Sequence, residues 1–201
     1  RYPKAKLPRL EIINTIVERM GKEVLQVKDM SVLSKPQNAA YIKKCVIVDT
    51  NETWVDEIEW LSYLARADFF LSPPGIVMPM CHNVIEAMAV GSIPITNYPE
   101  WFTPGLTHME NCIVFDDHDD LIIKLKRALV IDGEEIARMR TNVLDYYETY
   151  LRPDTFVHRI ESSKDNIITV LIITEANMAR YSSKLKKSSV LMRGKVPGMY
   201  V

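Results

Sequence analysis

The residues best suited to chemistry lie on either side of one short loop. An apolar run, Asp68–Leu71, leads into the loop Ser72-Pro73-Pro74-Gly75, and a helical pattern begins soon afterwards at His82. On that helix His82 and Glu86 are four residues apart, so their side chains project from one face. A carboxylate such as Glu86 can accept hydrogen bonds from both vicinal hydroxyls of a ribose, and His82 or Asn83 can donate to phosphate or sugar oxygens. The group therefore predicts a site for a nucleoside.

The loop itself favours an anionic ligand. In open α/β sheets, ligands bind beyond the carboxyl ends of the strands, which is where Pro74 and Gly75 are expected to lie. Free N–H groups at the start of the following helix, together with its dipole, would stabilise a diphosphate there. Gly75 would let the backbone approach that ligand closely, because glycine has no Cβ. Pro74 and Gly75 are therefore predicted to bind the ligand.

Helical and strand-like segments alternate, which predicts an α/β sheet. Apolar residues at helical spacing predict helices over 10–20, 57–66, 82–90, 119–130 and 134–150. Gly21, Gly91 and Pro153 are suited to end three of these helices. Short apolar runs predict strands over 45–48, 68–71, 92–96 and 113–115. Pro94 within the third strand favours an edge position or an irregular end, and the run 167–174 is compatible with either a strand or a helix.

Bulk composition is that of an ordinary globular domain and names no partner. Of 201 residues, 47% are hydrophobic and 25% are charged, and the formal net charge is -1. Nucleic-acid binding is not expected, because bulk charge gives no reason to invoke it. The most apolar run is far short of the roughly 20 residues needed to cross a bilayer. We expect a cytoplasmic protein, membrane-associated if its basic tail contacts lipid.

Neither the cysteines nor the acidic residues form a recognisable metal site. Cys45, Cys81 and Cys112 are odd in number and widely spaced, which favours buried thiols in a reducing compartment. The acidic run 116–120 directly precedes a helical pattern, where aspartates cap a helix and complement its dipole. We therefore expect no metal. The chain also lacks GxxxxGK[ST], GxGxxG and GxSxG, which argues against P-loop, dinucleotide-binding and serine-hydrolase functions.

The strand, the PPG loop and the helix running into EAMAVGSIPI resemble the donor-binding domain of GT-B glycosyltransferases, and most closely the exostosin-like group. The resemblance covers roughly residues 60 to 130. It implies that Glu86 contacts the ribose of a nucleotide sugar and that Arg9, at the start of the first helix, lies against the diphosphate. Many retaining members carry a second glutamate eight positions earlier, where this chain has Met78. Retaining and inverting chemistry therefore both stay open.

The resemblance implies a fold, a reaction and a division of the chain. Residues 1–155 would form a Rossmann-like parallel sheet flanked by helices, one half of a GT-B fold, and residues 156–201 an extension returning to an N-terminal domain outside this sequence. The reaction would be transfer of a sugar from a UDP- or GDP-sugar to a hydroxyl of a glycan or lipid-linked acceptor, with no other cofactor. The alternative is a catalytically silent module that binds a nucleotide sugar or a glycan. The catalytic residues are not identified.

The end of the chain carries the only lopsided charge cluster. After Met178 it contains six basic residues and no acidic one: Arg180, Lys184, Lys186, Lys187, Arg193 and Lys195. Such a segment is usually a solvated end. Two other roles remain open, namely peripheral contact with anionic lipid and packing against a second domain.

Overall fold

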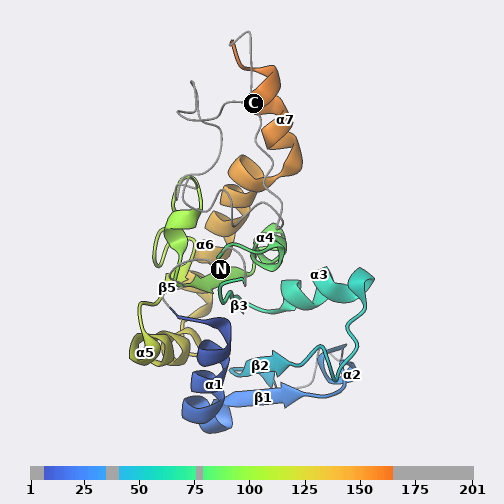
Figure 1. The fold of residues 1–201 in the computed structure, drawn as a ribbon, viewed down its shortest axis with the longest axis vertical. Coiled ribbons are helices and arrows are strands. Elements are labelled where there is room, and N and C mark those ends of the chain that lie inside the picture. Colours follow the sequence, from blue (N-terminus) through green and yellow to red (C-terminus); the bar gives the residue numbers. More distant parts are fainter. Residues whose placement is uncertain (1–6, 35–40, 76–78, 165–201) are drawn as a thin grey trace, which may run out of the picture.

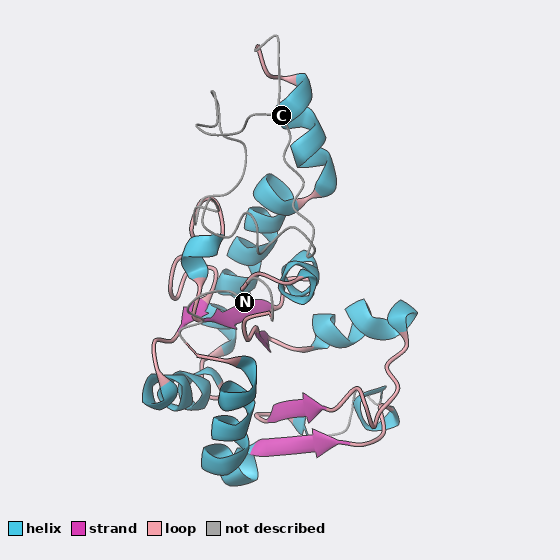
Figure 2. Cartoon of the chain, in the orientation of Figure 1, coloured by secondary structure: helices cyan, strands magenta, loops and turns pink. Residues whose placement is uncertain are grey.

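A computed structural model describes residues 7–34, 41–75 and 79–164 of the chain. It shows a mixed α/β fold in which two short parallel sheets are flanked by helices (Figures 1 and 2). The α/β alternation predicted from the sequence is therefore confirmed. Segment 167–174 and the basic residues of the tail lie outside the described residues, as does Met78. The proposed boundary after residue 155 stays a prediction.

The first sheet contains two strands. Strand β1, Val24–Val27, runs parallel to β2, Cys45–Val48, with Val24 opposite Cys45. Helix α1, Arg9–Met20, precedes them and ends at Gly21, whose φ of 53° is a conformation that glycine adopts at little cost. Strand β1 is not among the predicted strands, because four residues around an exposed Gln26 give too short a pattern to separate from a loop.

The second sheet contains three parallel strands in the order β3-β4-β5. These are β3, Phe69–Leu71, β4, Ile93–Thr96, and β5, Ile113–Val114. The sheet's carboxyl end leads into the loop at Ser72 and, from β4, into Asn97. Every residue of β4 is buried. This sheet therefore carries the strand and the loop on which the predicted site depends.

Strand β4 is the middle strand, so of the two predicted alternatives for Pro94 the edge position is wrong and the irregular strand end fits. The N–H of Ile93 donates to the Asp68 carbonyl, and the Ile95 carbonyl accepts from Ser72, so both residues bond towards β3. Along a strand alternate residues bond to opposite neighbours, which turns Pro94 towards β5. Pairing with β5 begins only at Ile95, opposite Ile113. Pro94 therefore lies one residue before the first β4–β5 pair, so its lack of an N–H removes no hydrogen bond from that pairing.

Seven helices occur in the described residues, and most begin where the sequence predicts. Besides α1 they are α2, Ser31–Ser34, α3, Glu57–Arg66, α4, His82–Ala89, α5, His118–Ala128, α6, Gly133–Tyr146, and α7, Pro153–Glu161. Side chains of Asp56, Asp117 and Asp132 cap α3, α5 and α6. The predicted helix 134–150 is α6 followed by a π-helical segment, Tyr147–Leu151. Pro153 begins a further helix, since its fixed φ suits the first helical position.

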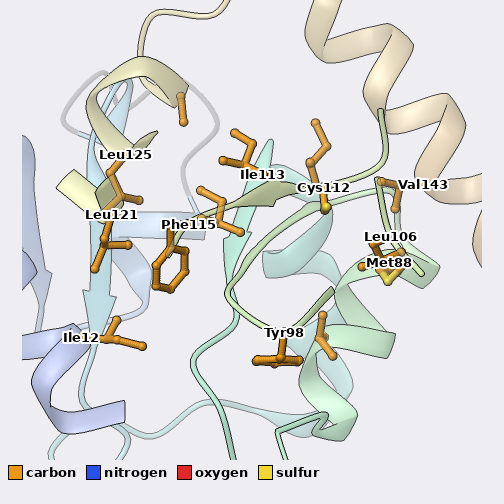
Figure 3. Close-up of a cluster of buried hydrophobic side chains, with 14 of the residues drawn as sticks. Ile12, Met88, Tyr98, Leu106, Cys112, Ile113, Phe115, Leu121, Leu125 and Val143 are labelled. Carbon is orange, nitrogen blue, oxygen red and sulfur yellow. The ribbon is translucent and has the colours of Figure 1, made fainter. Parts of the chain in front are cut away.

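The core joins α1 and α5 to the second sheet. Phe115, directly after β5, is fully buried and points towards Ile12 of α1 and Leu121 of α5 (Figure 3). A second group contains Met88 of α4 and Val143 of α6 (Figure 3). Packing of α1 on this core fixes where its amino end lies relative to the strands.

Arg140 of α6 makes hydrogen bonds to the ends of α3 and α4, next to the start of β3. Its guanidinium donates to the carbonyls of Ala65 and Ala67, each at 3.1 Å, and to that of Val90 at 3.4 Å. These carbonyls end α3 and α4. One side chain thus holds the elements on both sides of the PPG loop.

Candidate functional site

The loop after β3 is held at both of its ends. The Ser72 N–H continues the ladder to the Ile95 carbonyl at 2.9 Å, and the Gly75 N–H donates to the Pro79 carbonyl at 3.1 Å. The Ser72 hydroxyl lies 2.5 Å from the Tyr98 hydroxyl, which comes from the segment after β4. Pro74 is buried and Gly75 is half-buried. The predicted ligand loop is therefore a fixed turn at the carboxyl end of the sheet.

Arg9 reaches this loop from the start of α1. Its Nε donates to the Pro74 carbonyl at 3.5 Å, a contact between residues 65 apart in the sequence. Arg9 itself is exposed. The structure therefore brings together three of the predicted site residues: Arg9, Pro74 and, next to it, Gly75. A guanidinium beside backbone at the end of a strand is suited to binding an anion.

Helix α4 begins without a side-chain cap. Its N-cap residue is Cys81, whose side chain makes no capping hydrogen bond, whereas aspartates cap α3, α5 and α6. The first N–H groups of α4 therefore have no acceptor within the helix. His82 is exposed and Asn83 is half-buried. Both side chains remain accessible to a ligand at this helix end.

Glu86 is half-buried and faces α3. Its Oε2 accepts a hydrogen bond of 2.7 Å from the indole N–H of Trp60, which lies 26 residues earlier. The carboxylate is thus held in one orientation instead of turning to bulk water. A carboxylate has two oxygens and about four acceptor positions, so this bond leaves capacity for ribose hydroxyls. Nothing in the sequence pattern identified Trp60.

The structure gives two parts of the predicted site separately. One part is Arg9 with Pro74 and Gly75, and the other is α4 with Glu86 and Trp60. The loop and α4 both follow β3, whereas Arg9 and Trp60 come from α1 and α3. A contact between Glu86 and the loop residues is not among the described interactions. A nucleotide that touches both parts would have to span the amino end of α4.

Burial favours the neutral forms of Tyr98, Cys45 and Cys112 by raising their pKa values. Burial raises the pKa of Tyr98 to about 12, although its hydrogen bond with Ser72 acts in the opposite direction. Burial also raises the pKa of Cys45 to about 11 and that of Cys112 to about 12. All three cysteines are free thiols, but only Cys112 is fully buried, so the prediction of buried thiols is wrong for the half-buried Cys45 and Cys81.

The acidic run before α5 serves as a helix cap. Asp117 accepts from the Asp120 N–H at 2.9 Å, and Asp120 accepts from the Asp116 N–H at 3.1 Å. The first bond caps α5 at its N-cap residue Asp117, and the second satisfies the N–H of Asp116, the residue before the cap. Across the described ranges, no three His, Cys, Asp or Glu side chains are placed to hold a metal ion. The capping role predicted for the run is confirmed.

Comparison of the chain with protein-family models, with curated proteins and with solved structures found no match. Within the described part of the chain, no helix is both long and apolar enough to span a bilayer.

Proposed function

We propose that this chain is the donor-binding domain of a nucleotide-sugar-dependent glycosyltransferase, with a Rossmann-like sheet that forms one half of a GT-B fold. The contact between Arg9 and the Pro74 carbonyl carries the proposal most directly. It places a permanent positive charge beside the loop at which the diphosphate of a UDP- or GDP-sugar is expected. The resemblance of EAMAVGSIPI to such enzymes motivated that expectation, and the contact supports it independently of the motif.

In this proposal the domain binds the donor at two places, the ribose and the diphosphate. Glu86 accepts hydrogen bonds from the ribose, and Trp60 acts as a positioning residue that fixes the carboxylate through its indole N–H. Arg9 and the amino end of α4, whose N-cap side chain makes no capping bond, bind the diphosphate, and Gly75 lets the backbone approach it closely because glycine has no Cβ. His82 and Asn83 lie in the first turn of that helix, where they can donate to phosphate or sugar oxygens.

The same groups would stabilise the leaving group during transfer. The bond between the anomeric carbon and the diphosphate breaks, and an acceptor hydroxyl forms the new bond to that carbon. Negative charge then develops on the departing diphosphate, where a guanidinium and helix N–H groups lower its energy. The acceptor, a glycan or a lipid-linked sugar, would be held by a second domain. That domain would also supply any general base.

The test is calorimetric titration of the full chain with a panel of ligands. We expect UDP or GDP and the matching nucleotide sugar to bind, and the parent nucleoside to bind more weakly, because it lacks the diphosphate. Incubation with the nucleotide sugar and an acceptor then separates the two functions. If the full-length protein binds the nucleotide sugar but releases no nucleoside diphosphate from it, the result would support the silent module instead. If no nucleotide binds at millimolar concentration, the donor-binding proposal is wrong.

A further inference from the structure

Asn97 is a buried donor that the proposed site has not yet used. It follows β4 directly, its exposed fraction is 2%, and its Nδ2 makes no hydrogen bond in the described part of the chain. A buried amide without a partner costs about 1–3 kcal/mol, so such groups are uncommon in folded proteins. Its position at the carboxyl end of the middle strand is where ligands of open α/β sheets bind.

The sheet register shows which way Asn97 faces. Ile95 pairs with Ile113 and Thr96 with Val114, and the Phe115 N–H extends this ladder to the Thr96 carbonyl at 3.2 Å. Paired positions share a face of the sheet, so Asn97 lies on the same face as Phe115. Phe115 points towards Ile12 of α1 (Figure 3). Carried one residue past the ends of β4 and β5, the register therefore places Asn97 on the face of the sheet from which Phe115 meets α1.

The first N–H groups of α1 have no capping partner among the residues that the structure describes. Its N-cap residue is Pro8, which makes no side-chain cap, so the first N–H groups of the helix have no acceptor within it. Arg9, the first helical residue, reaches the Pro74 carbonyl at 3.5 Å. Glu11 in the same turn lies with its carboxylate 3.5 Å from Nε2 of His118 on α5. The free N–H groups, the guanidinium and the Asn97 amide are all donors.

We propose that the Asn97 side chain donates its amide hydrogens to a phosphate oxygen of the ligand and thereby completes a diphosphate subsite at the amino end of α1. This inference rests on the proposed function for the identity of the whole ligand, a nucleoside diphosphate sugar. It adds a specific residue and a location. The diphosphate is bound on the α1 side of the loop by Asn97 and Arg9, as well as by the helix after β3.

The test uses Asn97→Asp, which keeps the shape of the side chain and replaces the NH₂ donor with a carboxylate oxygen. Ser92→Ala is the matched control, because the Ser92 hydroxyl is also buried and has no hydrogen-bond partner among the described residues, but lies before β4, at its opposite end. Calorimetry is carried out with UDP, GDP, inorganic pyrophosphate and the parent nucleosides. We expect Asn97→Asp to weaken diphosphate and pyrophosphate binding about tenfold to hundredfold, and Ser92→Ala to leave both unchanged.

The outcomes separate this inference from the proposed function. Pyrophosphate binding that depends on Asn97 without any preference for a nucleotide would support the subsite and contradict the donor-binding role. Nucleotide binding that is equal in wild type and Asn97→Asp would overturn the subsite alone. Absence of binding by every phosphate-containing ligand would overturn both.

A second variant covers the case in which the aspartate prevents folding. Asn97→Leu has a similar shape and removes the unpartnered amide, so its thermal unfolding temperature should not fall while its pyrophosphate affinity falls about tenfold or more. Unchanged pyrophosphate affinity in a folded Asn97→Leu protein would contradict the subsite.

Discussion

Replacing Phe115 with alanine is expected to lower the free energy of unfolding by about 3–5 kcal/mol. The ring is fully buried and points towards Ile12 and Leu121, which come from the two helices on that side of the sheet (Figure 3). Its loss removes apolar contacts and leaves a cavity that rigid neighbours cannot fill. A domain of this size is typically stable by about 5–15 kcal/mol, so the variant would be close to unfolding.

Urea unfolding of Phe115→Ala measures this effect, and Ile123→Ala on α5 is the control. Ile123 is 61% exposed, so its truncation should change stability by less than about 0.5 kcal/mol. Because Phe115 holds α1 against the sheet, the variant should also loosen Arg9 from the loop and weaken nucleotide binding. Equal stability losses in the two variants would show that α1 and α5 are not packed on the sheet as described.

Replacing Glu86 with glutamine is expected to weaken nucleotide binding by about 1–3 kcal/mol, the range for hydrogen bonds that involve a charged group. The amide oxygen can still accept from Trp60, so the side chain should keep its orientation and the fold its stability. Only the negative charge and one acceptor group are lost. Calorimetry should show a loss for UDP or GDP but none for pyrophosphate, because Glu86 is assigned to the ribose.

Trp60→Phe tests the same contact from the other side. It removes the indole N–H and leaves the Glu86 carboxylate in place, so affinity should fall by less than in Glu86→Gln. If either variant is destabilised but both keep the nucleotide affinity of the wild type, the Glu86–Trp60 pair is only a structural contact between α3 and α4. The role assigned to Glu86 would then be wrong.

The elements were largely predictable because their signals are local. Helices α3, α4 and α5 each repeat apolar residues at helical spacing, and the capping role predicted for the acidic run before α5 is the one that Asp117 performs. Strand β1 was missed because its pattern is too short to separate from a loop. The edge position predicted from Pro94 was wrong for a physical reason. The cost of a proline in a strand depends on whether the neighbouring strand that its N–H would face is paired at that position. Register, which sequence does not show, decides that.

The sequence suggested which residues could form the site but not the contacts that hold them in place. Glu86, Pro74 and Gly75 were proposed from the motif, and the resemblance placed Arg9 against a diphosphate; the contact of Arg9 with the Pro74 carbonyl was not predicted. Nor were the partners that fix their geometry: Trp60 lies 26 residues from Glu86, and Tyr98 lies 26 residues from Ser72. Asn97 carries no sequence signal at all, because a buried amide without a partner is a property of the fold.

The most direct test of the central claim uses the indole signal of Trp60 in a nitrogen-15 NMR spectrum of the chain. Its N–H donates to the carboxylate assigned to the ribose, so added UDP or GDP should shift this signal progressively towards a saturated position. Trp54, which is 82% exposed, provides the internal reference and should not move. A Trp60 signal that stays in place at nucleotide concentrations that calorimetry shows to saturate the protein would contradict a nucleotide site at Glu86.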